Sequence, residues 1–121
     1  MDLPEARQRK NLLFDFYEAL LTQRQRDVFT MHYMDDNSLV EIGEAMEITP
    51  QAVADMLKRT IGRLEHYDKL LGLTKKFEAQ QATVAKIQLA LDDFEKTSLT
   101  PEITAITSQI RRLLTNLTSD F

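Results

Sequence analysis

No cysteine occurs in the sequence, and glycine and proline are scarce. Without cysteine, its 121 residues can form neither a disulfide framework nor a zinc site built on thiolates. Three glycines and three prolines are few for a β-sandwich or barrel, because those folds need many tight turns. The composition therefore favours long helices. With 43% hydrophobic and 28% charged residues, the chain is typical of a soluble globular protein.

Two further absences limit where and how the chain acts. No apolar run approaches the roughly 18 residues that span a bilayer, and the N-terminal string MDLPEARQRKN lacks the apolar centre of an export signal. We therefore expect no membrane insertion. The net charge of −4 is unfavourable for a protein that binds duplex DNA through counterion release, so any nucleic-acid binding would have to depend on local charge.

The patterns of a catalytic or cofactor site are also lacking. The two histidines, His32 and His66, fall on different predicted helices and are expected to be packed or hydrogen-bonded rather than metal ligands. The aspartate pairs at 35–36 and 92–93 lack the alternating ligands and central glycine of a calcium loop. No glycine-rich loop is present to cradle a nucleotide. We therefore predict no enzyme, no cofactor and no metal site.

The sequence does contain a series of helices with clear start signals. These signals are, in chain order, Pro4, the capping boxes Thr22–Gln25 and Ser38–Glu41, and the pair Thr49–Pro50. They predict helices over residues 4–20, 22–34, 38–46 and 50–71, the last with Gly72 as its C-terminal cap. Two more helices are predicted over residues 75–96 and from residue 101 onward. An all-α fold follows.

The helix predicted over residues 50–71 carries an apolar stripe that we expect to face the core. Its members recur three and four residues apart: Val53, Met56, Leu57, Thr60, Leu64, Tyr67 and Leu71. The basic residues Arg7, Arg9 and Lys10 precede the apolar stripe of the first helix. We expect these three side chains to form a solvated face.

The segment SLVEIGEAMEITPQAVADMLKRT, residues 38–60, has the parts of a helix-turn-helix. A short helix, a tight turn and a longer capped helix follow one another. Gly43 stands where the two helices would cross closely, and Val53 and Met56 would hold the second helix against the first. Any two packed helices would show similar apolar spacing. The small residue, the turn and the capped restart together favour the helix-turn-helix.

From about residue 11 to residue 77 the sequence resembles the YlxM family, small proteins related to region four of bacterial sigma factors. The resemblance rests on three runs: LLFDFYEALLT (12–22), HYMDDNSLVEIGE (32–44) and QAVADMLKRT (51–60). It implies a bacterial cytoplasmic protein with a sigma-like helix-turn-helix. It also implies a regulatory connection to the signal recognition particle, because the family's genes usually lie beside that of the particle's GTPase.

Three positions depart from the pattern that the resemblance leads us to expect. Pro50 stands where an arginine is expected, Ala54 where an aromatic residue is expected, and Glu47 where the turn usually has glycine. The first two departures remove one phosphate donor and one large contact from the surface that would meet nucleic acid. They leave the predicted fold unchanged.

The candidate nucleic-acid-binding residues lie on or beside the expected exposed side of the 50–71 helix: Thr49, Gln51, Asp55, Lys58, Arg59 and Arg63. In a sigma-like dock this side enters a major groove, where Gln51 suits an adenine edge and Lys58 or Arg59 suits guanine or phosphate. Asp55 would repel phosphate unless it accepts a hydrogen bond from a cytosine amine. Three cations against Asp55 give residues 50–64 a charge of +2, but four glutamates turn this into −2 over residues 38–66. A solvated helix face is the alternative interpretation.

We expect residues 1–72 to form the helix-turn-helix domain and residues 73–121 a C-terminal helical segment for packing and dimerisation. The last helix carries a narrow apolar seam whose members alternate three and four residues apart: Ile103, Ile106, Ile110, Leu113 and Leu117. So short a seam needs a partner. It either closes a hairpin on the apolar stripe between Phe77 and Phe94 or joins two subunits, and both arrangements can hold together.

Two functional hypotheses follow. The first is a non-enzymatic helix-turn-helix regulator that binds DNA, or alternatively RNA, as a homodimer. The second is a protein-interaction adaptor in the signal recognition particle pathway that keeps the sigma-like fold without binding nucleic acid. Lys58, Arg59 and Arg63 favour the first hypothesis, whereas the acidic net charge favours the second.

Overall fold

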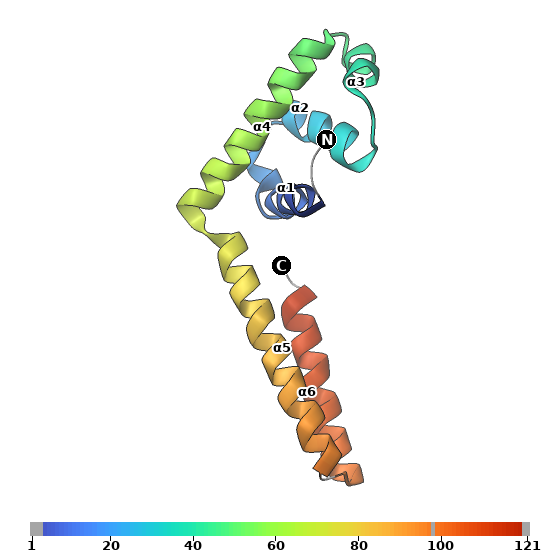
Figure 1. The fold of residues 1–121 in the computed structure, drawn as a ribbon, viewed down its shortest axis with the longest axis vertical. Helices are drawn as coiled ribbons and strands as arrows, with labels where there is room; N and C mark the ends of the chain where they lie inside the picture. Colours follow the sequence, from blue (N-terminus) through green and yellow to red (C-terminus); the bar gives the residue numbers. More distant parts are fainter. Residues whose placement is uncertain (1–3, 98, 120–121) are drawn as a thin grey trace. The chain divides into compact units, whose positions relative to one another are not determined.

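The computed structural model describes residues 4–97 and 99–119, and every regular element in these ranges is helical (Figure 1). The elements are α1 (Pro4–Tyr17), η1 (Glu18–Leu20), α2 (Gln23–Phe29), η2 (Thr30–Met34), α3 (Leu39–Met46), α4 (Pro50–Leu71), α5 (Leu73–Thr97) and α6 (Pro101–Ser119). The all-α prediction is confirmed. The chain divides into two compact units between Thr74 and Lys75, and each unit is described by itself below.

The predicted helix caps are present with their hydrogen bonds. The Thr22 and Ser38 hydroxyls each accept a backbone N–H three residues on, and the glutamine or glutamate at that position reaches back to the cap. Thr49 accepts from the Ala52 N–H at 3.1 Å. Gly72 ends α4 in the left-handed conformation, with φ of 65°. Because capping atoms lie within one helical turn of each other, these boundaries follow directly from the sequence.

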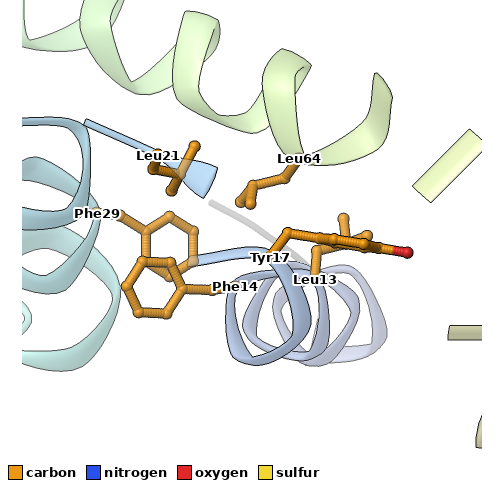
Figure 2. Close-up of a cluster of buried hydrophobic side chains, with 6 residues drawn as sticks. All are labelled: Leu13, Phe14, Tyr17, Leu21, Phe29 and Leu64. Carbon is orange, nitrogen blue, oxygen red and sulfur yellow. The ribbon is translucent and has the colours of Figure 1, made fainter. Parts of the chain in front are cut away.

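The first unit has one core where α1 meets α2 and α4. Figure 2 shows its six buried side chains, which are Leu13, Phe14, Tyr17, Leu21, Phe29 and Leu64. The Phe14 and Phe29 rings stack with centroids 4.3 Å apart, and Leu64 reaches this cluster from α4. Burial of these apolar side chains is the main force that holds α1 against the rest of the unit.

A second cluster joins α2, α3 and α4. Its buried members are Val28, Ile42, Val53 and Leu57, with Met46, Ile48 and Met56 packed around them. The predicted stripe of α4 is therefore confirmed over its first four turns, where Val53, Leu57 and Leu64 are enclosed. It is wrong at its end, because Leu71 is 51% exposed in the last turn of α4.

The helix predicted over residues 22–34 changes type at Thr30. It is α-helical to Phe29 and π-helical over Thr30–Met34, so it ends at the predicted residue 34. His32 Nδ1 lies 3.1 Å from the carbonyl oxygen of Asn37, which fits the hydrogen-bonded role expected for it. His66 instead has an exposed side chain, so the expectation of a packed histidine is wrong there.

The N-terminal basic residues are partly solvated, with the Arg7 and Arg9 side chains 41% and 46% exposed, but they are also paired. Arg7 binds the Asp36 carboxylate at 2.6 Å, and Arg9 binds Glu65 at 2.7 Å. The Lys10 ammonium lies 5.3 Å from the centre of a tyrosine ring. These cations are therefore engaged within the first unit, where they attach α1 to the segments that follow α2 and to α4.

A polar network ties the end of α4 to α1 and to the start of α5. The buried Tyr17 hydroxyl donates to Asp68 at 2.8 Å and accepts the Leu73 N–H at 3.1 Å. Thr74 donates to the same carboxylate through its hydroxyl at 2.6 Å and its N–H at 3.2 Å. Burial alone would raise the pKa of Asp68, but the hydrogen bonds from Thr74 and Tyr17, together with the nearby Arg9 charge, lower it.

The second unit is a hairpin of α5 and α6. Arg111 of α6 binds Asp92 at 2.6 Å and Glu95 at 3.3 Å, which places the two helices side by side in antiparallel order. The side chains buried within the described part of this unit are Val84, Thr107 and Leu114. The predicted intrachain seam is therefore displaced. Ile106, Leu113 and Leu117 are 58, 60 and 48% exposed, because Thr107 and Leu114 make the contact with α5.

Candidate nucleic-acid interface

The helix-turn-helix consists of α3, a short turn and α4. The turn needs a residue in the left-handed conformation, and Glu47 adopts it with φ of 60° and ψ of 43°. The Ile48 N–H then donates to the carbonyl of Gly43 at 2.9 Å. A Cβ at position 43 would lie 2.6 Å from the Ile48 carbonyl oxygen. The close approach predicted at Gly43 is therefore confirmed, and it fixes the angle at which α4 leaves α3.

The candidate site residues on α4 all have exposed side chains. We call this surface the α4 face and define it by Gln51, Asp55, Lys58, Arg59 and Arg63. The opposite side of the helix is buried against the two clusters. Thr49 is placed differently, since its hydroxyl accepts the Ala52 N–H and serves as the N-cap. Its role here is to begin the helix that carries the other five residues.

Charge on the α4 face is partly neutralised within the helix. Arg59 and Asp55 form an ion pair at 3.6 Å, with side chains 79% and 70% exposed. Such an exposed pair contributes little to stability, but it places a carboxylate beside the guanidinium. Lys58 and Arg63 form no ion pair with any other residue that the structure describes. They are the cations of this face that can meet a phosphate without losing a partner.

The structure adds Arg24 to the candidate interface. A shallow hollow of about 330 Å³ lies between the start of α2 and α4, and its lining includes Arg24, Gln25, Asp55 and Arg59. Arg24 is exposed and extends the basic surface beyond α4. Sequence reasoning missed it because Arg24 and Arg59 are distant in the sequence, and only packing of α2 against α4 brings them to one hollow.

The surface around the turn of the helix-turn-helix is acidic and partly apolar. A second hollow, of about 480 Å³, lies at the turn and is lined by Val40, Glu44, Glu47, Ile48 and Pro50 among others. Val40 is 56% exposed. The basic α4 face thus borders a surface that carries two carboxylates and an uncovered apolar side chain.

Neither a metal centre nor a transmembrane helix is found among residues 4–97 and 99–119. No group of three or more histidine, aspartate or glutamate side chains gathers there in a way that could hold a metal ion. None of the helices in these ranges combines the length and the hydropathy that crossing a membrane requires.

Comparison with known proteins identifies the family. Residues 4–103 match the sequence profile of the UPF0122 family, described as "Putative helix-turn-helix protein, YlxM / p13 like". A UPF0122 protein of Bacillus mycoides is 47% identical over 87 residues, covering 72% of this chain and 79% of that protein. UPF0122 proteins of Bacillus cereus and Bacillus thuringiensis are 46% identical over the same length and shares. With the helix-turn-helix geometry described above, these matches mean that the chain belongs to the UPF0122 family of YlxM / p13-like helix-turn-helix proteins.

Proposed function

We propose that this protein is a non-enzymatic regulator that contacts double-stranded DNA through the α4 face. The observation that carries the proposal is the pair of exposed cations, Lys58 and Arg63, on the second helix of a helix-turn-helix whose opposite side is buried. The second helix of this motif docks into the major groove. Gln51 lies near its N-terminal end, where side chains reach base edges.

The two cations of the α4 face that form no ion pair with a described residue can be removed together. Lys58→Ala with Arg63→Ala should weaken binding to a short mixed-sequence duplex about tenfold, since each lost phosphate contact removes counterion release. The slope of log affinity against log salt should fall by roughly 0.9 for each contact. Fluorescence anisotropy measures both quantities. Circular dichroism should be unchanged, because both side chains are exposed.

The matched control removes the same number of positive charges from a different helix. Lys86→Ala with Lys96→Ala removes two exposed cations from α5 and should leave affinity and salt slope as in the unsubstituted protein. Equal loss in both double variants would mean that only net charge matters and would remove the α4 face from the proposal. Binding of structured RNA but not of duplex DNA would replace DNA as the ligand.

A second prediction concerns the carboxylate on the α4 face. Asp55→Asn should strengthen duplex binding about two- to tenfold at low salt, because it frees Arg59 from its 3.6 Å ion pair and removes a charge that repels phosphate. The same anisotropy titration measures the change. Unchanged or weaker binding by Asp55→Asn would mean that Asp55 does not face phosphate in the complex.

The acidic hollow at the turn favours a second candidate function. Glu44, Glu47 and the exposed Val40 suit a basic, partly apolar protein surface better than a phosphate backbone. On this alternative the protein is an adaptor, and the family resemblance suggests the signal recognition particle pathway. A pull-down with and without nuclease separates the two functions, since a protein partner retained after nuclease treatment supports the adaptor, and loss of all binding supports tethering through nucleic acid.

A further inference from the structure

The α5–α6 hairpin exposes apolar side chains from both of its helices. Ile87 and Phe94 of α5 are 39% and 47% exposed, and Ile106, Leu113 and Leu117 of α6 are 48 to 60% exposed. We call these five residues the hairpin apolar face. They are not scattered, because helical geometry places all of them on one side of the contact between α5 and α6.

The side on which these residues lie follows from the contact rows, which are the heptad positions buried where α5 meets α6. Val84 on α5 and Thr107 with Leu114 on α6 are buried between the helices. Arg111 stands four residues after Thr107, and Glu95 stands one heptad and four residues after Val84. These two side chains are joined at 3.3 Å. The positions four residues after the contact rows therefore share one side of the hairpin.

On a helix, positions three residues after a contact-row residue lie on one side of the row, and positions four residues after it lie on the other. The positions three residues on therefore share the opposite side of the hairpin. Ile87 follows Val84 by three residues, and Leu117 follows Leu114 by three. Phe94 lies one heptad after Ile87. Ile106 and Leu113 directly precede Thr107 and Leu114. One residue back from the contact row, they lie on the same side of α6 as Leu117. The hairpin apolar face is thus continuous over both helices.

The charged residue within the described heptad rows on this side is Lys76, in the first turn of α5. The other members of the same rows are Gln80, Thr83, Ala90, Thr97, Ile103 and Ile110. The ion pairs of Arg111 with Asp92 and Glu95 lie on the opposite side. A surface with a single cation at one end offers little for selecting a charged partner, whereas a second copy of the same apolar surface matches it in character.

The hairpin also buries too little to be stable on its own. In its described residues the enclosed side chains are Val84, Thr107 and Leu114, and one of these is polar. Two amphipathic helices with so small a core are marginal in water. Two such hairpins packed face to face would form a four-helix bundle, in which the apolar rows of all four helices fill a common core.

We propose that the hairpin apolar face is a homodimer interface, occupied by the same face of a second copy. The available area is sufficient. At 1.5 Å per residue the 19 residues of α6 extend about 28 Å, and two adjacent helices are about 20 Å wide. The footprint is then roughly 560 Å² per copy, or about 1,100 Å² for both, which reaches the ~1,000 Å² expected of a stable interface.

The test compares two exposed leucines of the same hairpin. Leu113 is 60% exposed and belongs to the apolar face, whereas Leu89 is 64% exposed and stands five residues after Val84, away from the contact rows and the apolar face. Sedimentation of the full chain should give twice the 14.0 kDa chain mass for the unsubstituted protein and for Leu89→Glu. Leu113→Glu should sediment at the mass of one chain.

A second measurement holds even where Leu113→Glu loosens the hairpin. The thermal midpoint of a dimer rises with protein concentration, so it should rise for the unsubstituted protein and Leu89→Glu but not for Leu113→Glu. A single-chain mass for the unsubstituted protein would overturn the proposal, and so would a dimer that survives Leu113→Glu. The single-chain result would mean that another surface covers the face. Both readouts are independent of nucleic-acid binding, so this proposal and the proposed function can fail separately.

Discussion

Gly43→Ala should lower the free energy of unfolding by about 2 kcal/mol, as typical for overpacking a closed site. The added Cβ would stand 2.6 Å from the Ile48 carbonyl oxygen and 3.4 Å from the Pro50 nitrogen. Both are backbone atoms, so no side chain can rotate out of the way. Relief requires α3 and α4 to separate, which opens the cluster around Ile42 and Val53. Urea unfolding followed by circular dichroism measures the loss.

Gly62→Ala is the matched control for this substitution. Gly62 also lies in a helix of the same motif, but a Cβ there meets nothing within 4 Å. Alanine should therefore stabilise the protein by about 0.5–1 kcal/mol, because glycine costs that much inside a helix. If Gly43→Ala were as well tolerated as Gly62→Ala, the close crossing of α3 and α4 would not exist.

Tyr17→Phe should cost about 2 kcal/mol at pH 7, within the range for a hydrogen bond to a charged group. It removes the 2.8 Å bond to Asp68 and the acceptor of the Leu73 N–H. Tyr17 is only 1% exposed, so water cannot replace the lost hydroxyl. Tyr67→Phe is the control, because the Tyr67 hydroxyl makes one exposed contact at 3.4 Å and its loss should change stability by under about 0.5 kcal/mol.

The effect of Tyr17→Phe should also shrink at low pH. Although burial raises the pKa of Asp68, the hydrogen bonds from Thr74 and Tyr17 outweigh it and the pKa is lowered on folding. The stabilisation from this carboxylate is therefore complete above its unfolded pKa of about 4. It is lost as the pH falls from there through the lower pKa of the folded state. A stability difference between Tyr17→Phe and the unsubstituted protein that did not shrink as the pH falls below the unfolded pKa of about 4 would contradict this role for Asp68.

Rules that use residues within one helical turn predicted where the helices start. Such rules cannot predict contacts between residues that are distant in the sequence. A capping box needs two residues three positions apart, so Ser38 and Glu41 suffice to begin α3. The network at Asp68 joins residues 51 positions apart in the sequence, and no local rule links them. The change to π-helix at Thr30 likewise left no signal in the capping residues from which we predicted this helix.

The C-terminal seam packs within the hairpin only in part, for a different reason, and its role in joining two subunits stays a prediction. Apolar residues on α6 occupy two overlapping stripes, one through Ile103, Ile110 and Leu114 and another through Ile106, Leu113 and Leu117. The contact with α5 uses Thr107, a residue type that a hydrophobic pattern counts as polar. Sequence spacing therefore detects that α6 is amphipathic but cannot decide which stripe the chain covers itself.

For the candidate interface, sequence reasoning identified the exposed side of α4 but not its neighbours. The positions of Gln51, Lys58 and Arg63 follow from helical periodicity once Val53 and Leu57 are assigned to the core. The approach of Arg24 to the same surface depends on how α2 packs against α4. Whether these side chains bind nucleic acid is a prediction that the Lys58 and Arg63 double variant tests.

The network at Asp68 determines where this chain can be shortened. Leu73 and Thr74 are hydrogen-bonded to side chains of the first unit, although they are the first two residues of α5. A fragment cut at Gly72 would leave the Asp68 carboxylate without its Thr74 donors and the enclosed Tyr17 hydroxyl without the Leu73 N–H. Uncompensated polar groups of this kind are costly. The shortest helix-turn-helix fragment that keeps the hydrogen bonds of Tyr17 and Asp68 therefore extends through Thr74.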